Sequence, residues 1–339
     1  MKVDVIIPVY KPGKRFSELL FRLSAQERTP DQIIVINTGK EYWDAFAAGE
    51  GKKAIPENLS VYHVTPQEFD HGATRDMGLK KSDADVCIFM TDDALPADRH
   101  LITRLCGALG ITRADDACPD AGTRHGEMAA GADGADVRRE RTVRIAAAYA
   151  RQLPDPGCRV IERYTREFNY PAKSMVKTID DLPRLGIKTY FCSNVCAAYP
   201  RKLYLELGGF TRKTIFNEDM IFAAHAMKEG YAVAYAADAR VIHSHNYSCL
   251  EQFHRNFDLA VSQADHPEVF AGVPSEGEGI RLVKKTAAYL LKSGHALMIP
   301  YLIAGSGCKY AGYLLGKRYR RLPLWLVKRC SMNRNYWKG

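Results

Sequence analysis

Three features that would assign the chain to particular protein classes are missing from its sequence. No Gly-x-Gly-x-x-Gly motif follows the first apolar segment, so a dinucleotide cofactor is not indicated. The apolar run over 296–307 is too short to span a bilayer. Asp4 interrupts the segment in which a signal peptide would have its apolar core, so we do not expect a secreted protein.

A cysteine framework is also missing. Nine cysteines are spread over 339 residues without a repeated spacing. The nearest pair, Cys192 and Cys196, has no second pair and no nearby histidine to complete a zinc site. We therefore expect reduced thiols in a cytoplasmic protein. A hydrophobic share of 46% with 26% charged residues is ordinary for a soluble globular protein and argues against disorder.

Acidic residues are absent from the last 60 positions. Thirteen Lys or Arg over 280–339 contribute +13 to a net charge of +9, so the first 279 residues carry −4. Apolar and aromatic residues alternate with these cations, which suits an anionic membrane surface. Nucleic-acid binding and a plain solvated helical hairpin are the competing interpretations of this segment.

Apolar runs of strand length alternate with helical patterns along the chain. Strands are expected over 3–10, 32–36, 59–64, 86–90, 143–149, 190–199 and 239–242, and helices from Phe16 and over 72–81. This alternation predicts an α/β fold with a parallel sheet and right-handed crossovers. The segment 112–141 is rich in Ala, Gly, Asp and Arg and poor in large apolar residues, so we expect a flexible surface insertion there.

Two adjacent acids, Asp92 and Asp93, end the apolar strand over 86–90, and Pro96 follows them. In an open α/β sheet, ligands bind beyond the carboxyl ends of the strands, so these acids should line a site. A divalent cation that holds substrate phosphates is the usual partner of such carboxylates. The alternative is a turn with two solvated acids, since Asp favours turns.

A second acidic pair and two histidines follow later in the chain. Asn217 is a good N-cap, and acids at positions 218 and 219 would complement the dipole of the helix behind them, which alone would explain both. The same dipole would keep the carboxylate ionised and available as a base. His243 and His245 follow the last expected strand and share one face if the strand geometry continues.

The ordered set of these segments resembles glycosyltransferase family 2 enzymes of GT-A fold, most closely their bacterial rhamnosyltransferase branch. The similar segments are 7–10, 37–39, 69–75, 91–96, 192–196, 208–210, 217–219 and 243–248. The resemblance implies a Rossmann-like mixed sheet flanked by helices, with a basic helical C-terminal extension. The expected parts are a nucleotide-sugar-binding half over 1–111, the insertion over 112–141, an acceptor and catalytic half over 142–250, and the helical region over 251–339.

The resemblance also implies an inverting transfer of a sugar from a nucleotide diphosphate donor to a hydroxyl. Asp219 matches the catalytic base, and Asp93 matches a carboxylate that binds Mg²⁺ or Mn²⁺, with His243 or His245 completing the coordination. Thr91 stands where the first acid of that metal motif usually is. The implied nucleotide-sugar-binding residues are Pro8, Tyr10, Asn37, Arg75, Asp92, Asp93 and Glu218. Among these, the amide oxygen of Asn37 would accept the ring N–H of the base, and Arg75 would neutralise the diphosphate.

By the same resemblance, dTDP-L-rhamnose is the expected donor and a lipid-linked or surface polysaccharide the expected acceptor. The basic tail then predicts an enzyme peripheral on the inner face of the cell membrane, with no nucleic-acid partner. Three alternatives stay open: a UDP-hexose donor, a sugar-phosphate nucleotidyltransferase, and an inactive membrane-bound assembly partner.

Overall fold

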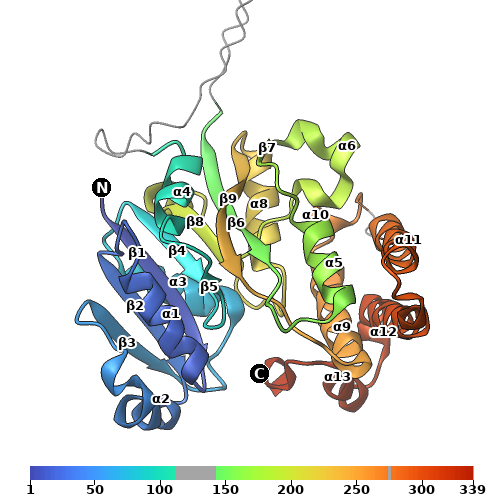
Figure 1. Cartoon of the computed structure of the whole chain (residues 1–339), viewed down its shortest axis with the longest axis horizontal. Helices are drawn as coiled ribbons and strands as arrows, with labels where there is room; N and C mark the ends of the chain where they lie inside the picture. The colour runs from blue at the N-terminus through green and yellow to red at the C-terminus, as the bar shows by residue number, and fades with distance from the viewer. Residues whose placement is uncertain (112–142, 274–275, 339) are drawn as a thin grey trace, which may run out of the picture.

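A computed structural model describes residues 1–111, 143–273 and 276–338 (Figure 1). Within them, nine strands form one sheet in the order β3-β2-β1-β4-β8-β6-β9-β5, and β7 pairs with another part of β9. The strands are β1 Val3–Tyr10, β2 Gln32–Thr38, β3 Leu59–Val64, β4 Val86–Met90, β5 Leu95–Pro96, β6 Ile145–Leu153, β7 Met175–Lys177, β8 Cys196–Pro200 and β9 Ala232–Ile242. The insertion expected over 112–141 lies outside the described residues.

Helices flank the sheet, with short 3-10 turns between some of them (Figure 1). They are α1 Lys14–Ser24, α2 Lys40–Ala48, α3 His71–Lys81, α4 Leu101–Ala108, α5 Val160–Asn169, α6 Leu182–Leu185, α7 Arg201–Glu206, α8 Glu218–Lys228, α9 Cys249–Asp265, α10 Pro267–Phe270, α11 Glu276–Lys292, α12 Ile299–Lys317 and α13 Leu324–Cys330. The fold class expected from the sequence, a mixed α/β sheet flanked by helices with a helical C-terminal region, is confirmed.

Both faces of the central strands are buried, which explains why those strands are continuous apolar runs. In β1, Val5 and Ile7 face one core, which α1, α2 and α4 cover. Ile6 faces the other core, which α3, α7 and α8 cover. The apolar stripe of α1 that includes Phe16 and Leu20 therefore packs against one face of the sheet.

The sheet is mixed rather than parallel throughout, because β8, β5 and β7 run against their neighbours while β6 and β9 pair in parallel. Strands β3, β2, β1 and β4 run parallel, but β8 runs antiparallel to β4 and β6 antiparallel to β8. The all-parallel sheet inferred from strand–helix alternation is therefore wrong for β8, β5 and β7. The strand expected over 190–199 is also shorter, because Ser193 and Asn194 lie in a loop before β8. The last strand is longer than expected and begins at Ala232.

The C-terminal helices are packed onto the rest of the protein (Figure 1). Helix α12 lies so close to α9 that a Cβ atom at Gly312 would sit 2.2 Å from the Phe253 carbonyl oxygen, and one at Gly316 would sit 2.3 Å from that of Phe257. The Asp258 carboxylate on α9 also accepts hydrogen bonds from backbone N–H groups beyond α13. Among the described residues, no helix combines the length and apolarity needed to cross a bilayer.

Candidate active site

A very short strand brings the first acidic pair to the histidines. Strands β8 and β6 separate β4 from β9 in the sheet. After β4, however, the chain turns back as β5 and pairs with the end of β9, so that Leu95 lies opposite Ile242. Asp93 precedes this pair on one strand and His243 follows it on the other. The antiparallel pairing therefore places the two side chains at one edge of the sheet.

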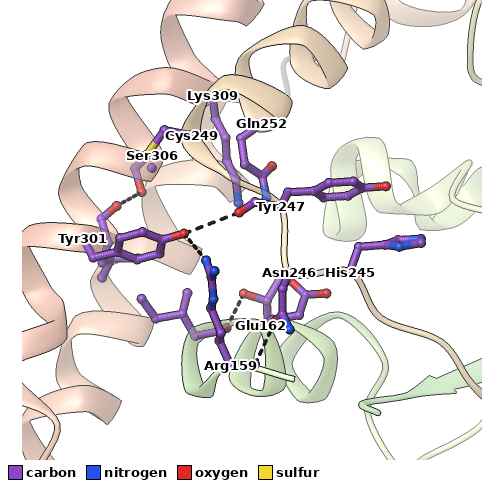
Figure 2. Close-up of a pocket in the computed structure, with 14 residues that line it drawn as sticks. Arg159, Glu162, His245, Asn246, Tyr247, Cys249, Gln252, Tyr301, Ser306 and Lys309 are labelled. Carbon is purple, nitrogen blue, oxygen red and sulfur yellow. Dashed lines mark hydrogen bonds between the residues drawn. The ribbon is translucent and has the colours of Figure 1, made fainter. Parts of the chain in front are cut away.

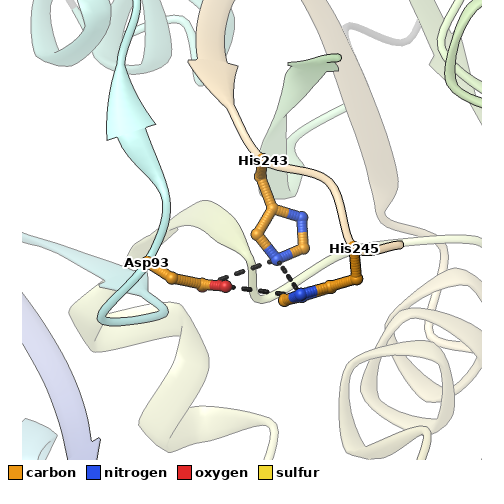
Figure 3. A group of neighbouring side chains, drawn as sticks. All are labelled: Asp93, His243 and His245. Carbon is orange, nitrogen blue, oxygen red and sulfur yellow. Dashed lines mark hydrogen bonds and ion pairs between the residues drawn. The ribbon is translucent and has the colours of Figure 1, made fainter. Parts of the chain in front are cut away.

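Asp93, His243 and His245 direct their ligand atoms toward one another (Figure 3). His243 Nε2 lies 3.5 Å from Asp93 Oδ1, and His245 Nε2 lies 3.3 Å from Asp93 Oδ2. The two Nε2 atoms are 3.0 Å apart. Two ligand nitrogens that are each about 2.1 Å from one ion and at right angles lie about 3 Å apart. The cluster therefore fits a divalent cation, and its two imidazoles favour Mn²⁺ over Mg²⁺.

A buried glutamine orients the first histidine. Gln152 Oε1 lies 3.0 Å from His243 Nδ1 and also accepts a hydrogen bond from Arg166. Because an oxygen can only accept, Nδ1 of His243 carries a proton. Its Nε2 then directs a lone pair, or a second proton, at Asp93. Such outer hydrogen bonds fix the ring and tautomer of metal-binding histidines.

Two further side chains hold the acidic loop in place. The Thr91 hydroxyl donates a hydrogen bond of 2.8 Å to Asp93 Oδ1. Arg15 on α1 donates to the Asp93 carbonyl at 2.8 Å and to the Ile242 carbonyl at 3.3 Å. Arg15 thus ties the loop after β4 to the end of β9, while Thr91 orients the carboxylate.

The charge states within the cluster suit a cation. Burial by itself would raise the pKa of Asp93, but the hydrogen bond and charge of His243, with help from His245 and Thr91, hold that pKa well below its usual range. Burial, together with the neighbouring His243, lowers the pKa of His245 to about 4. At neutral pH Asp93 is ionised and His245 is neutral, so both have lone pairs free for a metal.

The second acidic pair opens α8, next to the loop before β8. The Arg75 guanidinium lies 3.2 Å from Glu218 Oε1, and both side chains are buried. Asn194 donates from its side chain to Glu218 at 3.1 Å and from its backbone N–H to Asp219 Oδ2 at 2.9 Å. The family resemblance predicted that Arg75 contacts the donor diphosphate. In the described structure its guanidinium faces Glu218. Its contact with a diphosphate stays a prediction.

Two expectations about this helix start are wrong. Asn217 occupies the N-cap position with a positive φ of 65°, but its side chain makes no capping hydrogen bond and donates instead to the Leu259 carbonyl. The helix dipole also does not keep Asp219 fully ionised. Burial and the charge of Glu218 raise the pKa of Asp219 to about 7, although two backbone N–H groups donate to its carboxylate.

Hydrogen bonds connect the two clusters. Gln152, which orients His243, donates from Nε2 to the Ser193 hydroxyl at 2.9 Å. The next residue, Asn194, donates to Asp219. The loop over 193–195 therefore fixes the base candidate and the metal candidate relative to each other, with only a few polar side chains between them.

The remaining predicted residues lie at the carboxyl ends of β1 and β2, where Pro8 pairs with Ile36 and Tyr10 with Thr38. Tyr10 is 52% exposed, and its ring packs edge-on against Tyr42. The Asp92 carboxylate accepts a hydrogen bond from the Tyr10 backbone N–H. Burial and the charge of Asp93 raise the pKa of Asp92 to about 7.

Asn37 lies next to this surface but is fully buried. Its Nδ2 donates to the Gly39 carbonyl at 2.8 Å and lies 3.2 Å from a ring nitrogen of His63. Its Oδ1 is buried and has no hydrogen-bond partner. This unpaired oxygen agrees with the prediction that Asn37 accepts the ring N–H of the nucleotide base. Because the oxygen is buried, the nucleotide base would reach it only after the side chains that cover it move.

Sequence reasoning missed four residues that organise the site: Arg15, Gln152, Arg166 and Asn194. Arg15 and Arg166 stand in ordinary helical segments, and Gln152 lies within a strand. No local pattern marks any of the three. Only Asn194 carried a signal, because it lies in a segment that resembled the family.

The chain is similar over its whole length to named proteins. The sequence profile described as "Glycosyl transferase family 2" matches residues 4–129. The "O-antigen chain rhamnosyltransferase RfbN" of Salmonella typhimurium (strain LT2) is 37% identical over 343 residues, which cover 100% of this chain and 97% of that protein. The "O-antigen chain rhamnosyltransferase WbaN" of Salmonella anatum is 31% identical, covering 99% and 95%.

Solved structures with low sequence identity also align with the chain. S. aureus TarS 1–349 in complex with UDP-GlcNAc aligns with a TM-score of 0.49 at 14% identity, over 95% of this chain and 92% of that chain. The mannosyltransferase PcManGT from Pyrobaculum calidifontis, in complex with GDP-Man and Mn²⁺, aligns with a TM-score of 0.49 at 15% identity, over 99% and 84%.

Proposed function

The chain belongs to glycosyl transferase family 2, and on this basis we propose that it transfers L-rhamnose from dTDP-L-rhamnose to a hydroxyl of a growing surface polysaccharide, with inversion. The family makes it a glycosyltransferase, and two relatives with full coverage carry the name O-antigen chain rhamnosyltransferase. The observation that carries the mechanism is the hydrogen-bonded connection between the Asp93–His243–His245 cluster and Asp219.

The donor is assigned to the carboxyl ends of β1, β2 and β4. The exposed ring of Tyr10 and the partly exposed ring of Tyr42 offer aromatic surface to the nucleotide base, and Lys11 lies 5.0 Å from the centre of each ring. Pro8, Asn37 and Asp92 border the same edge. The diphosphate would then reach from this surface to the Asp93 cluster, because Asp92 and Asp93 are adjacent in the chain.

Asp93, His243 and His245 are the residues that would hold a divalent ion. Such an ion, when bound, supplies positive charge that stabilises the leaving diphosphate. The chain itself contributes the geometry. Thr91 orients the Asp93 carboxylate, Arg15 holds the Asp93 backbone, and Gln152 presents the His243 lone pair.

Asp219 is assigned as the general base that takes the proton of the acceptor hydroxyl. A base works best when its pKa lies near the working pH, and burial with Glu218 places that of Asp219 at about 7. Asn194 fixes one carboxylate oxygen through its backbone N–H. Arg75 offsets the charge of Glu218, so that one negative charge rather than two must be accommodated beside the acceptor.

A thermal-shift panel tests the donor. The full chain is heated with dTDP-L-rhamnose, UDP-glucose, UDP-galactose or GDP-mannose, each with and without Mn²⁺. A ligand that binds the native state raises its stability by RT ln(1 + [L]/Kd), so we expect dTDP-L-rhamnose with Mn²⁺ to give the largest shift. A larger shift with a UDP-hexose would replace the donor assignment.

Product assays separate the other two activities. Formation of a nucleotide sugar from a nucleoside triphosphate and a sugar phosphate would indicate a nucleotidyltransferase. Absence of both hydrolysis and transfer with every donor that binds would indicate an inactive assembly partner.

We assign membrane association to the outer face of α12 and the residues before it. Leu297 is 96% exposed, Ile303 63% and Tyr310 57%, and the surrounding tail is strongly basic. Apolar side chains among cations favour an anionic bilayer surface.

Paired substitutions test this assignment better than deletion of 280–339, because deletion would uncover α9. Leu297→Glu with Ile303→Glu should abolish flotation with anionic liposomes. Phe21→Glu, at a residue on α1 that is 71% exposed, is the matched control and should float like the unchanged protein. Equal flotation of all three proteins would contradict the assignment.

A further inference from the structure

A pocket lies between the candidate active site and the C-terminal helices (Figure 2). Its walls come from the start of α5, the loop after β9, the start of α9 and the first half of α12. Its cavity volume is about 50 Å³, within about 510 Å³ of space that includes the open mouth. His245 forms part of the wall, so the pocket shares a residue with the Asp93 cluster.

Two cations line this pocket, and within 1–111, 143–273 and 276–338 neither is paired with an acid. Arg159 donates to the Tyr301 hydroxyl at 2.6 Å and lies over its ring. Lys309 on α12 is mostly buried. Within the described parts of the chain, Lys309 has neither a hydrogen bond nor an ion pair. Glu162, the acid in the lining, is already paired with Arg166 at 2.7 Å.

A mostly buried ammonium without a partner lowers the stability of the folded protein unless a ligand of opposite charge pairs with it. Burial lowers the pKa of Lys309. The negative charge of Glu162 raises this pKa, and the positive charges of Arg255 and Arg166 lower it further. One acid, Glu162, and two cations, Arg255 and Arg166, thus act on the Lys309 ammonium. An anionic group that enters the pocket would meet Lys309 and Arg159 from two walls, one on α12 and one at the start of α5.

The position of α12 limits what this anion can be. Tyr301, Ser306 and Lys309 of this helix line the pocket, and Ile303 and Tyr310, on the adjoining side of the same helix, are exposed. The pocket therefore lies between the reacting centre and the surface assigned to the membrane. An acceptor saccharide attached to a lipid through phosphate needs an anion site in that place.

We propose that this pocket binds the phosphate or diphosphate at the reducing end of the acceptor, with Lys309 and Arg159 as its ligands. The proposal rests on the proposed function, because it assumes an acceptor whose hydroxyl lies at Asp219. It assigns Lys309 to acceptor recognition and leaves donor binding to the other side of the Asp93 cluster. The phosphate can belong to a lipid-linked saccharide or to a soluble sugar phosphate.

Binding of simple phosphates to the full chain tests the proposal without knowledge of the acceptor sugar. The probes are inorganic pyrophosphate and decyl diphosphate, titrated calorimetrically in EDTA so that no metal site contributes. We expect both to bind, and Lys309→Met to weaken each at least about tenfold, since a charge-assisted hydrogen bond is lost. Lys309→Arg, which keeps the charge, should stay within about threefold of the unchanged protein.

Lys317→Met is the matched control, because Lys317 is an exposed lysine on the same helix outside the pocket. It should leave binding of both probes unchanged. Lys309→Met should not lower the melting temperature, since it removes an unpaired buried charge. Tighter binding of decyl diphosphate than of pyrophosphate would identify a lipid-linked acceptor, and equal binding would identify recognition of the phosphate alone.

Other results would overturn the proposal. These are no binding of either probe, or an equal loss of binding in the Lys309 and Lys317 variants. Binding of dTDP-L-rhamnose with Mn²⁺ is measured in parallel and should be the same in all variants. If the unchanged protein does not bind dTDP-L-rhamnose with Mn²⁺, that result would count against the proposed function. If Lys309→Met does not change probe binding, that result would count against the pocket alone.

Discussion

Two pairs of adjacent acids, Asp92–Asp93 and Glu218–Asp219, show the same division of charge. In each pair burial and a neighbouring carboxylate raise the pKa of one member to about 7, and hydrogen bonds and nearby basic side chains hold that of the other below its usual range. The partners differ. Asp93 is held by two histidines, whereas Glu218 is held by Arg75 and, more weakly, by His71 and Asn194.

Because of this difference, the Asp93 cluster can hold an exchangeable cation, whereas Glu218 and Arg75 form a permanent ion pair. A histidine nitrogen accepts either a proton or a metal, so the Asp93 cluster can bind and release an ion. An arginine cannot lose its charge, so Glu218 stays paired and its charge acts steadily on Asp219. The first cluster therefore suits leaving-group stabilisation, and the second suits proton removal.

The largest expected effect comes from the base. Asp219→Asn keeps an acceptor for the Asn194 N–H but cannot take a proton, so kcat should fall about 10²- to 10⁴-fold. The Kd for the donor with Mn²⁺ should not change. Steady-state kinetics and calorimetry provide both quantities, and Asp238→Asn, at an exposed residue, is the control. A folded Asp219 variant that loses donor binding as well would contradict the division between the two pairs.

The next effect tests the metal cluster through a residue that does not contact the ion. Gln152→Ala removes the acceptor for His243 Nδ1, so Mn²⁺ affinity should fall about 10- to 100-fold. Gln152→Glu keeps an acceptor and should bind more tightly than the alanine variant. Electron paramagnetic resonance of free Mn²⁺ measures both affinities. Wild-type affinity in Gln152→Ala would show that the ring needs no such support.

The pH dependence of kcat/KM tests how the charge of Glu218 acts on Asp219. As the proposed general base, Asp219 would act in its ionised form, and its pKa is raised to about 7. We therefore expect kcat/KM at saturating Mn²⁺ to rise with pH and level off above about 7. Glu218→Gln removes the like charge and leaves Arg75 beside Asp219. The rising limb should then move to lower pH by about one unit. Glu229→Gln, at an exposed position just after the same helix, should leave the limb in place. A shift to higher pH in the Glu218 variant would refute the coupling.

The smallest effect concerns the residue that replaces the usual first acid. Thr91→Val removes one hydrogen bond to Asp93, worth about 1 kcal/mol, so Mn²⁺ should bind roughly fivefold more weakly. Thr91→Ser keeps the hydroxyl and should bind like the unchanged protein. Unaltered affinity in the valine variant would show that Thr91 does not orient the carboxylate.

Much of the first half of the fold follows from local pattern. Strands β1, β3 and β4 have the predicted bounds. β1 and β4 are apolar runs buried on both faces, whereas β3 is a partly buried edge strand. The prediction of a strand over 190–199 was wrong for the part before β8, because apolar and aromatic residues there pack in a loop. That loop turns its Asn194 amides toward α8 instead of toward a neighbouring strand.

The sequence by itself determined which segments are buried and which residue types stand at their ends, because burial of apolar side chains acts over a few neighbouring positions. It also determined the basic character of the tail. Only the tertiary structure decided that β5 pairs with β9 and so brings Asp93 to His243, and that α12 closes a cationic pocket around Lys309. Those juxtapositions join residues more than a hundred positions apart. They depend on strand pairing and helix packing, for which a single stretch of sequence carries no periodic signal.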